Sequence, residues 1–144
     1  MEAVFFTVPG RPLNKFKGQM KSKSRSKDDR LQAARYWGYQ DWISRRAAEA
    51  MQGREMLTGR LVASVIAEGP VVDENMPDAD NLAKAPLDAM KGIVYPDDNQ
   101  IDVLVIGRRA WKFKPPEGEY VVYIGVQRLE DVREALDTIV GARA

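Results

Sequence analysis

The sequence predicts a single α+β domain, with a mixed or antiparallel β-sheet and helices packed on one of its faces. Its 144 residues suit one domain, and its hydrophobic share of 44% suits a packed core. Strand-like and helix-like segments follow one another in the order β-α-β-α-β-β-α, without the strict alternation of a parallel α/β fold. The chain has no internal repeat and no linker between domains, so we expect one domain.

The first half of the chain predicts a strand, a loop and a long helix. Residues 3–8 are mostly β-branched or aromatic and precede a Pro-Gly pair, which is typical of a strand. Residues 9–27 are rich in Pro, Gly, Lys and Ser, which indicates a loop. From residue 28 to about residue 52, apolar side chains recur every three or four positions and predict a helix. That apolar stripe consists of Tyr36, Tyr39, Trp42, Ile43, Ala47 and Ala50, and Trp37 lies off it.

The second half predicts three more strands and two helical segments. The strands are expected over residues 60–68, 101–110 and 119–127, the last two joined by a hairpin-like connection. An acidic loop over residues 69–79 leads into a helical segment over residues 80–92. Pro86 should kink or restart that helix, because proline has no amide hydrogen. Residues from Leu129 onward predict a short amphipathic C-terminal helix.

The absence of two residue types narrows the chemistry. Cysteine and histidine occur nowhere in the chain. Disulfides, thiolate metal sites, a Ser-His-Asp triad and a histidine general base are therefore excluded. Hydrolysis would have to use carboxylates, lysine, tyrosine or serine, or a metal ion with oxygen ligands. No apolar stretch is long enough to span a membrane and no secretory signal is visible, so we expect a cytoplasmic protein.

Charge is distributed unevenly, although the formal net charge is only +1. Residues 11–46 hold eleven Lys or Arg and three acidic residues, whereas residues 68–102 hold nine acidic residues and two Lys. This asymmetry suits a surface that binds a polyanion while carboxylates hold a divalent cation. Phosphate contacts are expected from Lys15, Lys17, Lys21, Lys23, Arg25 and Lys27. The structural alternative is a solvated basic loop that binds nothing.

The first acidic group lies around the start of the second helical segment. Asp78 and Asp80 are two residues apart, and extended chain that enters a helix there would point both carboxylates at one cation. Asp80, Lys84 and Asp88 are each four residues apart and would share one helix face. The structural alternatives are that Asp80 is only an N-cap, or that it pairs with Lys84 in an i,i+4 ion pair worth roughly 0.2–0.5 kcal/mol.

The second acidic group, Asp97 and Asp98, follows a Tyr-Pro turn. If these residues begin a strand, only one of them faces the site, and Asp98, Gln100 and Asp102 share its side. A third carboxylate from this group would complete an oxygen-rich site of the kind that Mg²⁺ or Mn²⁺ prefers. Two such ions can activate water for phosphodiester hydrolysis, and Lys84 would stabilise charge on the phosphate. The structural alternative is an ordinary turn.

The acidic stretch also contains a long pattern with fixed spacing. It consists of Asp78-x-Asp80-Asn81-Leu82-x-Lys84-x-x-Leu87-Asp88-Ala89 and, further on, Tyr95-x-Asp97-Asp98-x-Gln100-Ile101. A Pro-rich turn that ends in Asn14 precedes it near the N-terminus. Together these motifs resemble the signature of RusA-type Holliday junction resolvases, a family often encoded by phages and prophages. The correspondence covers about residues 3–127, and its specificity lies almost wholly in residues 77–101.

The resemblance implies a homodimeric, Mg²⁺-dependent endodeoxyribonuclease, with Mn²⁺ as the alternative ion. It implies resolution of four-way DNA junctions by paired, symmetrical nicks with ligatable ends. Asp78, Asp80 and Asp98 match the family's essential acidic residues, which gather around the metal ion. Lys84 matches its catalytic lysine, and Asn14 adds to the DNA-binding candidates. Supporting roles are implied for Asn81, Asp88 and Asp97.

Two features depart from the family pattern. Pro86 falls inside the helix that follows the signature, and the helix from Leu129 lies beyond the resolvase-like core of residues 1–128. The alternative function is a branched or single-stranded DNA-binding module with structural acids. Convergence of the three acidic residues on one point would distinguish the enzyme from this module. An unrelated nucleotide hydrolase would need a Gly-rich phosphate loop, and the sequence has no Walker A pattern.

Overall fold

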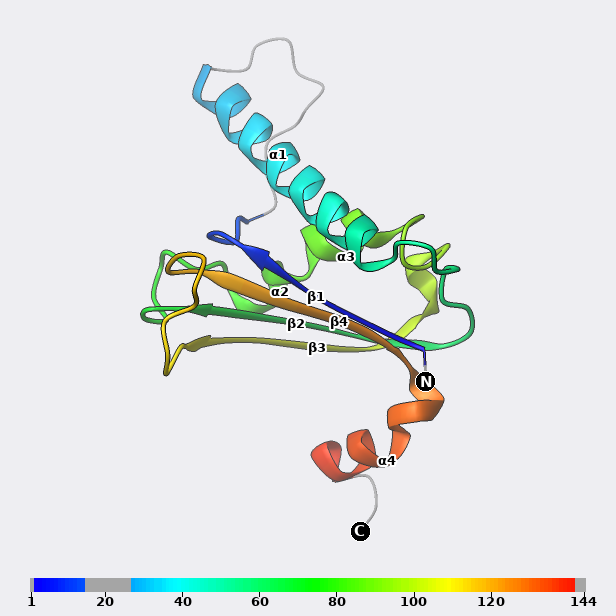
Figure 1. The fold of residues 1–144 in the computed structure, drawn as a ribbon. Coiled ribbons are helices and arrows are strands. Elements are labelled where there is room, and N and C mark those ends of the chain that lie inside the picture. The colour runs from blue at the N-terminus through cyan, green and yellow to red at the C-terminus, as the bar shows by residue number, and fades with distance from the viewer. Residues whose placement is uncertain (1, 15–26, 142–144) are drawn as a thin grey trace.

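A four-stranded mixed sheet organises the chain. The computed structural model describes residues 2–14 and 27–141. Its strands are β1 (Ala3–Pro9), β2 (Leu61–Gly69), β3 (Ile101–Ala110) and β4 (Val121–Arg128). They lie in the order β1-β4-β2-β3, where β2 is parallel to β3 and antiparallel to β4, and β1 is antiparallel to β4. The predicted α+β class and mixed sheet are confirmed (Figure 1).

The connection between β3 and β4 differs from the predicted hairpin. β3 lies at one edge of the sheet, and β2 separates it from β4. Val65 of β2 pairs with Ile106 of β3 on one side and with Ile124 of β4 on the other. The prediction failed because a loop rich in Lys, Pro and Gly shows where a strand ends, but not which neighbour the next strand takes.

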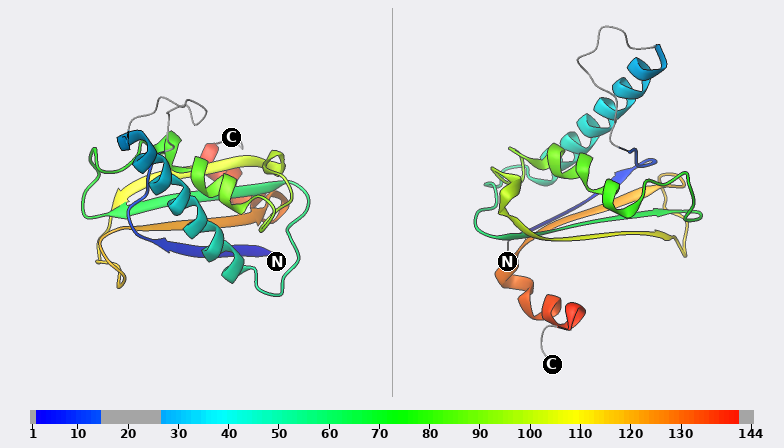
Figure 2. Two further views of the ribbon diagram at one scale, coloured as in Figure 1. Left: turned by 90° about the horizontal axis from the view of Figure 1, so that it is seen from above. Right: turned by 180° about the vertical axis from the view of Figure 1, so that it is seen from behind.

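Three helices cover one face of the sheet (Figures 1 and 2). They are α1 (Lys27–Ala50), α2 (Ala79–Leu82) and α3 (Lys84–Met90). The residues of α1 that are buried are Ala33, Tyr36, Tyr39, Ile43 and Ala47, which largely follow the predicted stripe. Trp42 is partly exposed, and its indole Nε1 donates to the Pro9 carbonyl at 3.0 Å. The N-terminal part of α1 projects away from the sheet (Figure 1).

The core lies between the sheet and these helices. Side chains of a strand alternate between its two faces, so alternate residues point into the core. Val4 and Val8 of β1, Val65 of β2, and Val122 and Val126 of β4 are almost completely buried there. Burying one such side chain contributes roughly 1.5–3 kcal/mol. This core fixes α1 and α3 over the sheet and so sets the positions of the polar segments that join them to the strands.

The segment after the acidic loop forms two short helices instead of one. Ala83 separates α2 from α3, and Pro86 is the third residue of α3. A continuous helix would need the amide of residue 86 to donate to the carbonyl of Leu82, which proline cannot do. The Leu87 amide instead donates to the Ala83 carbonyl at 2.9 Å and closes the first turn of α3. The predicted restart is confirmed, with the break three residues before the proline.

The C-terminal helix α4 (Leu129–Val140) is confirmed, but it lies on the opposite side of the sheet from the other helices (Figures 1 and 2). Its first amide, on Leu129, donates to the Arg60 carbonyl at 2.9 Å. It ends at Gly141, whose φ of 66° is a left-handed conformation that glycine adopts without strain. None of the residues of α4 is buried. No helix in the described ranges is long and apolar enough to cross a membrane.

Candidate active site

Asp78 and Asp80 lie where the loop after β2 enters α2. Asp78 is the N-cap residue of that helix and has φ −57° and ψ 151°. Its carboxylate accepts no capping hydrogen bond from the described residues, and its side chain is 78% exposed. Nη1 of Arg108 on β3 lies 3.9 Å from that carboxylate and 3.5 Å from the Pro77 carbonyl oxygen. Arg108 therefore links the start of α2 to the edge strand of the sheet.

Asp80 and Lys84 have neither of the structural roles that their spacing allows. Asp80 is the second residue of α2 and not its N-cap. The prediction of one continuous helix face through Asp80, Lys84 and Asp88 is wrong, because the chain breaks at Ala83 between α2 and α3. In the described parts of the chain, neither Asp80 nor Lys84 forms an ion pair. Both residues are exposed, which leaves their charges available to a ligand.

Asp98 begins the short 3₁₀ turn η1 (Asp98–Gln100), directly before β3. Asp97 caps this turn, because its Oδ1 accepts a hydrogen bond from the Asn99 amide at 3.1 Å. In return, the Asp97 amide donates to Gln100 Oε1 at 3.1 Å. The hydrogen bond from the Asn99 amide lowers the pKa of Asp97 below its usual value, and a side-chain hydrogen bond with Asp98 lowers it further. Asp97 thus has a structural role, whereas Asp98 is exposed.

The same turn corrects a predicted geometry. Asp98, Gln100 and Asp102 do not share one side of a strand, because a turn forms in place of the strand's start. Gln100 reaches back to the segment before β2, residues 57–60, where its Nε2 donates to two carbonyls at 3.1 and 3.2 Å. Asp102 accepts from Arg60, whose Nε lies 2.8 Å from Asp102 Oδ2. Gln100 and Asp102 therefore hold the turn in place, and the turn sets the backbone position of Asp98.

The buried phenol of Tyr95 connects this turn with α3. Its hydroxyl donates to the Leu87 carbonyl at 2.8 Å. Burial raises the pKa of Tyr95, and the negative charges of Asp98 and Asp88 raise it further. The charges of Asp88 in α3 and Asp98 in the turn therefore both raise the pKa of the Tyr95 hydroxyl group. Asn81, another predicted supporting residue, is half-buried in α2.

The acidic residues do not form a ready-made metal site within one chain. Among residues 2–14 and 27–141, no group of three Asp or Glu is placed to hold an ion. Asp78 and Asp80 belong to the start of α2, and Asp98 belongs to the turn before β3. Their chemistry still fits a hard divalent cation, because exposed carboxylates supply the oxygen ligands that Mg²⁺ and Mn²⁺ prefer. The donors are present, but the two segments would have to draw together around an ion.

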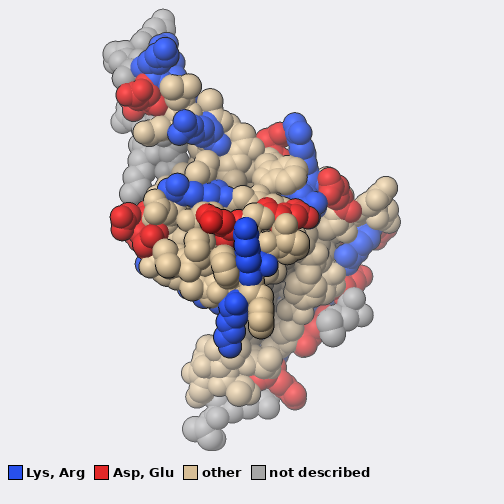
Figure 3. Space-filling view, turned by 60° about the vertical axis from the view of Figure 1, so that its left-hand side comes forward, with Lys and Arg blue, Asp and Glu red and all other residues tan. Residues whose placement is uncertain are grey.

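Most of the predicted DNA-binding residues lie outside the described residues: Lys15, Lys17, Lys21, Lys23 and Arg25. Asn14 and Lys27 border that gap, and both are exposed. Exposed basic residues continue along α1 with Arg30, Arg35 and Arg45. Figure 3 shows Lys and Arg side chains along α1 and, below them, Asp and Glu side chains with further Lys and Arg side chains among them. Trp37, which lies off the apolar stripe of α1, is 46% exposed beside these basic residues.

Two arginines at this site were missed by the sequence-based prediction. Arg60 contacts Asp102 across 42 positions of the sequence, and Arg108 contacts Pro77 across 31. The parallel pairing of β2 with β3 brings these distant segments together. The spacing of apolar residues within one segment does not predict contacts between distant segments, and neither arginine belongs to a recognisable sequence motif.

A comparison with protein-family models matches residues 9–124 to the family described as Endodeoxyribonuclease RusA. The matched region covers well over half of the chain. The chain belongs to the RusA endodeoxyribonuclease family. The RusA match includes both acidic segments and ends inside β4, so α4 lies outside it. A comparison with curated proteins finds no significant match.

Proposed function

We propose that this RusA-family chain is a Mg²⁺-dependent endodeoxyribonuclease that resolves four-way DNA junctions by paired, symmetrical nicks. The observation that carries the proposal concerns Asp80 and Lys84. Both are exposed, and neither has an ion pair within the described ranges. The break between α2 and α3 takes them out of the i,i+4 pairing that a continuous helix would give them, so their charges are not used within the described fold. Their unpaired charges inside the RusA match favour a role toward substrate.

We assign the ion to Asp78, Asp80 and Asp98. When bound, Mg²⁺ or Mn²⁺ supplies a Lewis acid that activates water and neutralises phosphate charge. The chain's own contribution is to present three carboxylates from two segments, the start of α2 and the turn before β3. Lys84, at the start of α3, presents an ammonium group to the phosphate, where negative charge increases in the transition state. Asn81, Asp88 and Asp97 are assigned to the support of these segments.

DNA binding is assigned to basic side chains of α1 and of the segment that precedes it. Arg30 and Arg35 of α1 are exposed, and Figure 3 shows Lys and Arg side chains along this helix. Basic residues attract the phosphate backbone, whereas carboxylates without a bound ion repel it. An ion held by Asp78, Asp80 and Asp98 would offset that repulsion and let the backbone approach them.

The face of the sheet opposite α1, α2 and α3, on whose side α4 also lies, supports a homodimer. Phe5 of β1, Tyr123 of β4 and Val105 of β3 are 64%, 40% and 39% exposed on this face. The Phe5 ring packs over Gly125, where an added Cβ atom would come within 2.8 Å of it. Exposed apolar side chains gathered on one face are typical of an interaction surface. A second copy packed there would place two acidic sites in one particle, which paired nicking requires.

We assign the nuclease core to residues 1–128 and regard residues 129–144 as an extension. Two observations support this division. The RusA match ends at residue 124, before α4 begins. α4 lies on the side of the sheet away from the other helices and has no buried residue, so it contributes little to the common core.

Cleavage of a labelled synthetic four-way junction, beside its matched linear duplex, tests the proposal. Both substrates are incubated with Mg²⁺, with Mn²⁺ and with EDTA. We expect metal-dependent, symmetrical nicks in the junction alone, with ends that DNA ligase reseals. Asp80→Asn should not cleave, whereas the control Asp131→Asn, an exposed acid in the first turn of α4, should cleave normally. Cleavage in EDTA would contradict the metal assignment, and equal cleavage of the duplex would contradict junction selectivity.

A second candidate function is a branched-DNA-binding module that does not cleave. The observation that favours it is that the described residues contain no group of three carboxylates placed to hold an ion. In that case the chain would bind the junction tightly and leave it intact in both metals. The same cleavage assay, combined with a binding titration in EDTA, separates this module from the nuclease.

A further inference from the structure

Arg60 joins the Asp98 turn to the segment before β2. Arg60 Nη2 donates to the Asn99 carbonyl at 2.6 Å, and Nε donates to Asp102 Oδ2 at 2.8 Å. Nη2 also contacts Asp102 Oδ1, so the guanidinium holds that carboxylate through two nitrogens. One planar side chain therefore fixes both the residue after Asp98 and the start of the strand that follows.

An irregularity in the sheet places Asp102 for this contact. Consecutive residues of β2 pair with Ile101 and Val103, so Asp102 is an extra residue in β3. Such a β-bulge re-aims a side chain, and bulges are common beside functional sites. Without the bulge, Asp102 would take its own partner in the regular ladder. The bulge and the Arg60 contact thus act on the same residue.

Gln100 ties the same turn to the same segment. Its Nε2 donates to the carbonyls of Leu57 and Gly59, and Gly59 has φ +83°, which glycine adopts without strain. The Leu57 amide in turn donates to the Val94 carbonyl at 2.8 Å. Residues 57–60 therefore form a platform that contacts the chain both before and after Asp98.

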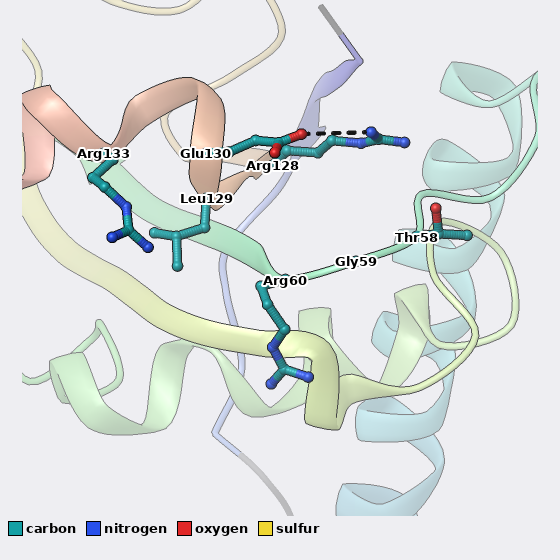
Figure 4. A pocket seen from close by; sticks show the side chains of 7 residues that line it. All are labelled: Thr58, Gly59, Arg60, Arg128, Leu129, Glu130 and Arg133. Atoms are coloured by element: carbon teal, nitrogen blue, oxygen red, sulfur yellow. Dashed lines mark ion pairs between the residues drawn. The ribbon is translucent and has the colours of Figure 1, made fainter.

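Arg60 is not part of a cluster that would bind an anion. It lines a cavity of about 290 Å³ together with Arg128 and Arg133. Figure 4 shows its guanidinium directed away from those two residues and across the start of β3. Arg128 is itself paired with Glu130 at 3.7 Å. The Arg60 guanidinium therefore contacts Asn99 and Asp102 at the turn and does not point into the cavity.

We propose that Arg60 is a positioning residue, which fixes Asp98 for ion binding by holding Asn99 and Asp102. This role rests on the proposed function, in which Asp98 is a metal ligand. The planar guanidinium matches a carboxylate with two parallel donors, and a lysine ammonium does not reproduce that geometry. The Arg60 side chain is 55% exposed, so its ion pair contributes little to folding stability. Its removal should therefore act on the site and not on the fold.

The test compares Arg60→Lys and Arg60→Gln with a matched control, Arg54→Lys. Arg54 precedes β2 as Arg60 does, but its Nη2 donates to the Ala3 carbonyl, away from the turn. Direct Mn²⁺ binding is followed by electron paramagnetic resonance, and nicking is followed against Mg²⁺ concentration. Both Arg60 variants should need roughly 10–100-fold more metal, as expected for a partner that orients a ligand. Junction affinity in EDTA should stay at the wild-type value, and the thermal unfolding midpoint should change little, as for the loss of one exposed ion pair.

A readout of the turn itself completes the experiment. The Asn99 amide, which is bonded to Asp97 Oδ1, should exchange its hydrogen faster in both Arg60 variants and at the normal rate in Arg54→Lys. Wild-type metal dependence and unchanged exchange in Arg60→Lys would overturn the positioning role. The Asp98→Asn variant distinguishes failure of the proposed function from failure of the proposed role of Arg60. If Asp98→Asn cleaves normally, the proposed function fails; if it is inactive while Arg60→Lys is normal, only the role of Arg60 fails.

Discussion

The two acidic segments of the candidate site are built in opposite ways. The Asp98 turn is held by side-chain hydrogen bonds from Arg60 and Gln100, so its backbone is fixed to the platform before β2. Asp78 and Asp80 instead enter a helix of four residues, whose N-cap accepts no side-chain hydrogen bond from the described residues. We call the Asp98 turn the fixed half of the site. We call the start of α2, whose carboxylates are exposed and which Arg108 links to β3 at 3.5 Å from the Pro77 carbonyl, the free half.

This difference bears on how a complete set of ligands could form, since the described residues contain no group of three carboxylates placed to hold an ion. Asp78, Asp80 and Asp98 are all exposed, so each side chain would lose rotamer freedom on binding an ion, and the difference lies in the backbone, which is already held at the turn that carries Asp98. Bringing Asp78 and Asp80 to Asp98 would move the start of α2, where the Asn81 amide donates to the Asp78 carbonyl at 2.9 Å. The complete site would then be a property of the metal-bound state.

Removing a carboxylate from the free half should have the largest effect. Asp80→Asn keeps the size of the side chain but loses the charge that would bind the ion. We expect the nicking rate to fall by roughly 10²–10³-fold, which is the usual effect of removing one charge-stabilising group from an active site by mutation. Junction binding in EDTA should be retained, because the phosphate contacts lie elsewhere. Single-turnover nicking and a binding titration measure the two effects, and an active Asp80→Asn protein would remove the metal-site assignment.

Making the free half rigid should have the next largest effect. Pro86→Ala removes the cause of the break at Ala83, so α2 and α3 should join into one helix. Asp80 and Lys84 would then pair, at a gain of about 0.2–0.5 kcal/mol, and be drawn away from substrate. Nicking should fall by up to about 10²-fold while helix content rises, as circular dichroism would show. Pro116→Ala, in the exposed loop between β3 and β4, is the control. A full nicking rate in a lengthened helix would contradict the need for the break.

Removing charge outside both halves should weaken DNA binding without changing the chemistry. Neutralising Lys21, Lys23 and Lys27 together should raise the dissociation constant of the junction complex. The salt dependence should become flatter, by about 0.9 in the logarithmic slope for each phosphate on the duplex arms that the protein no longer neutralises. Binding titrations at several salt concentrations measure the slope, and an unchanged slope would reduce the basic segment to a solvated loop.

The smallest expected effect concerns the fixed half at low pH. The hydrogen bond from Arg60 holds the pKa of Asp102 below its ordinary value of 3.8. A carboxyl with a lowered pKa in the folded state adds stability above the unfolded pKa, and that stability is lost as pH falls through the folded pKa. The difference in urea midpoint between wild type and Asp102→Asn should therefore be largest near neutral pH and disappear as pH falls below 3.8 and through the folded pKa. A difference that persists into strong acid would contradict this coupling.

The sequence predicted the local elements of the fold better than their arrangement. The strands, the long helix and the Pro86 restart follow from residue patterns within each segment, and all are confirmed. The neighbours of β3 and β4 do not follow from such patterns, because strand order depends on contacts between distant segments. The same limit applies to the site. Spacing and the family resemblance give the acidic residues as candidates, whereas Arg60 comes to light only through the pairing of β2 with β3.

Binding of Mn²⁺ in the absence of DNA tests most directly whether the two unlike halves form one site. The titration would use wild type, Asp80→Asn from the free half and Asp98→Asn from the fixed half. We expect one class of site in wild type, weakened at least tenfold in each variant, because both carboxylates would ligate the same ion. Equal Mn²⁺ affinity in all three proteins would contradict a shared metal site and favour the DNA-binding module.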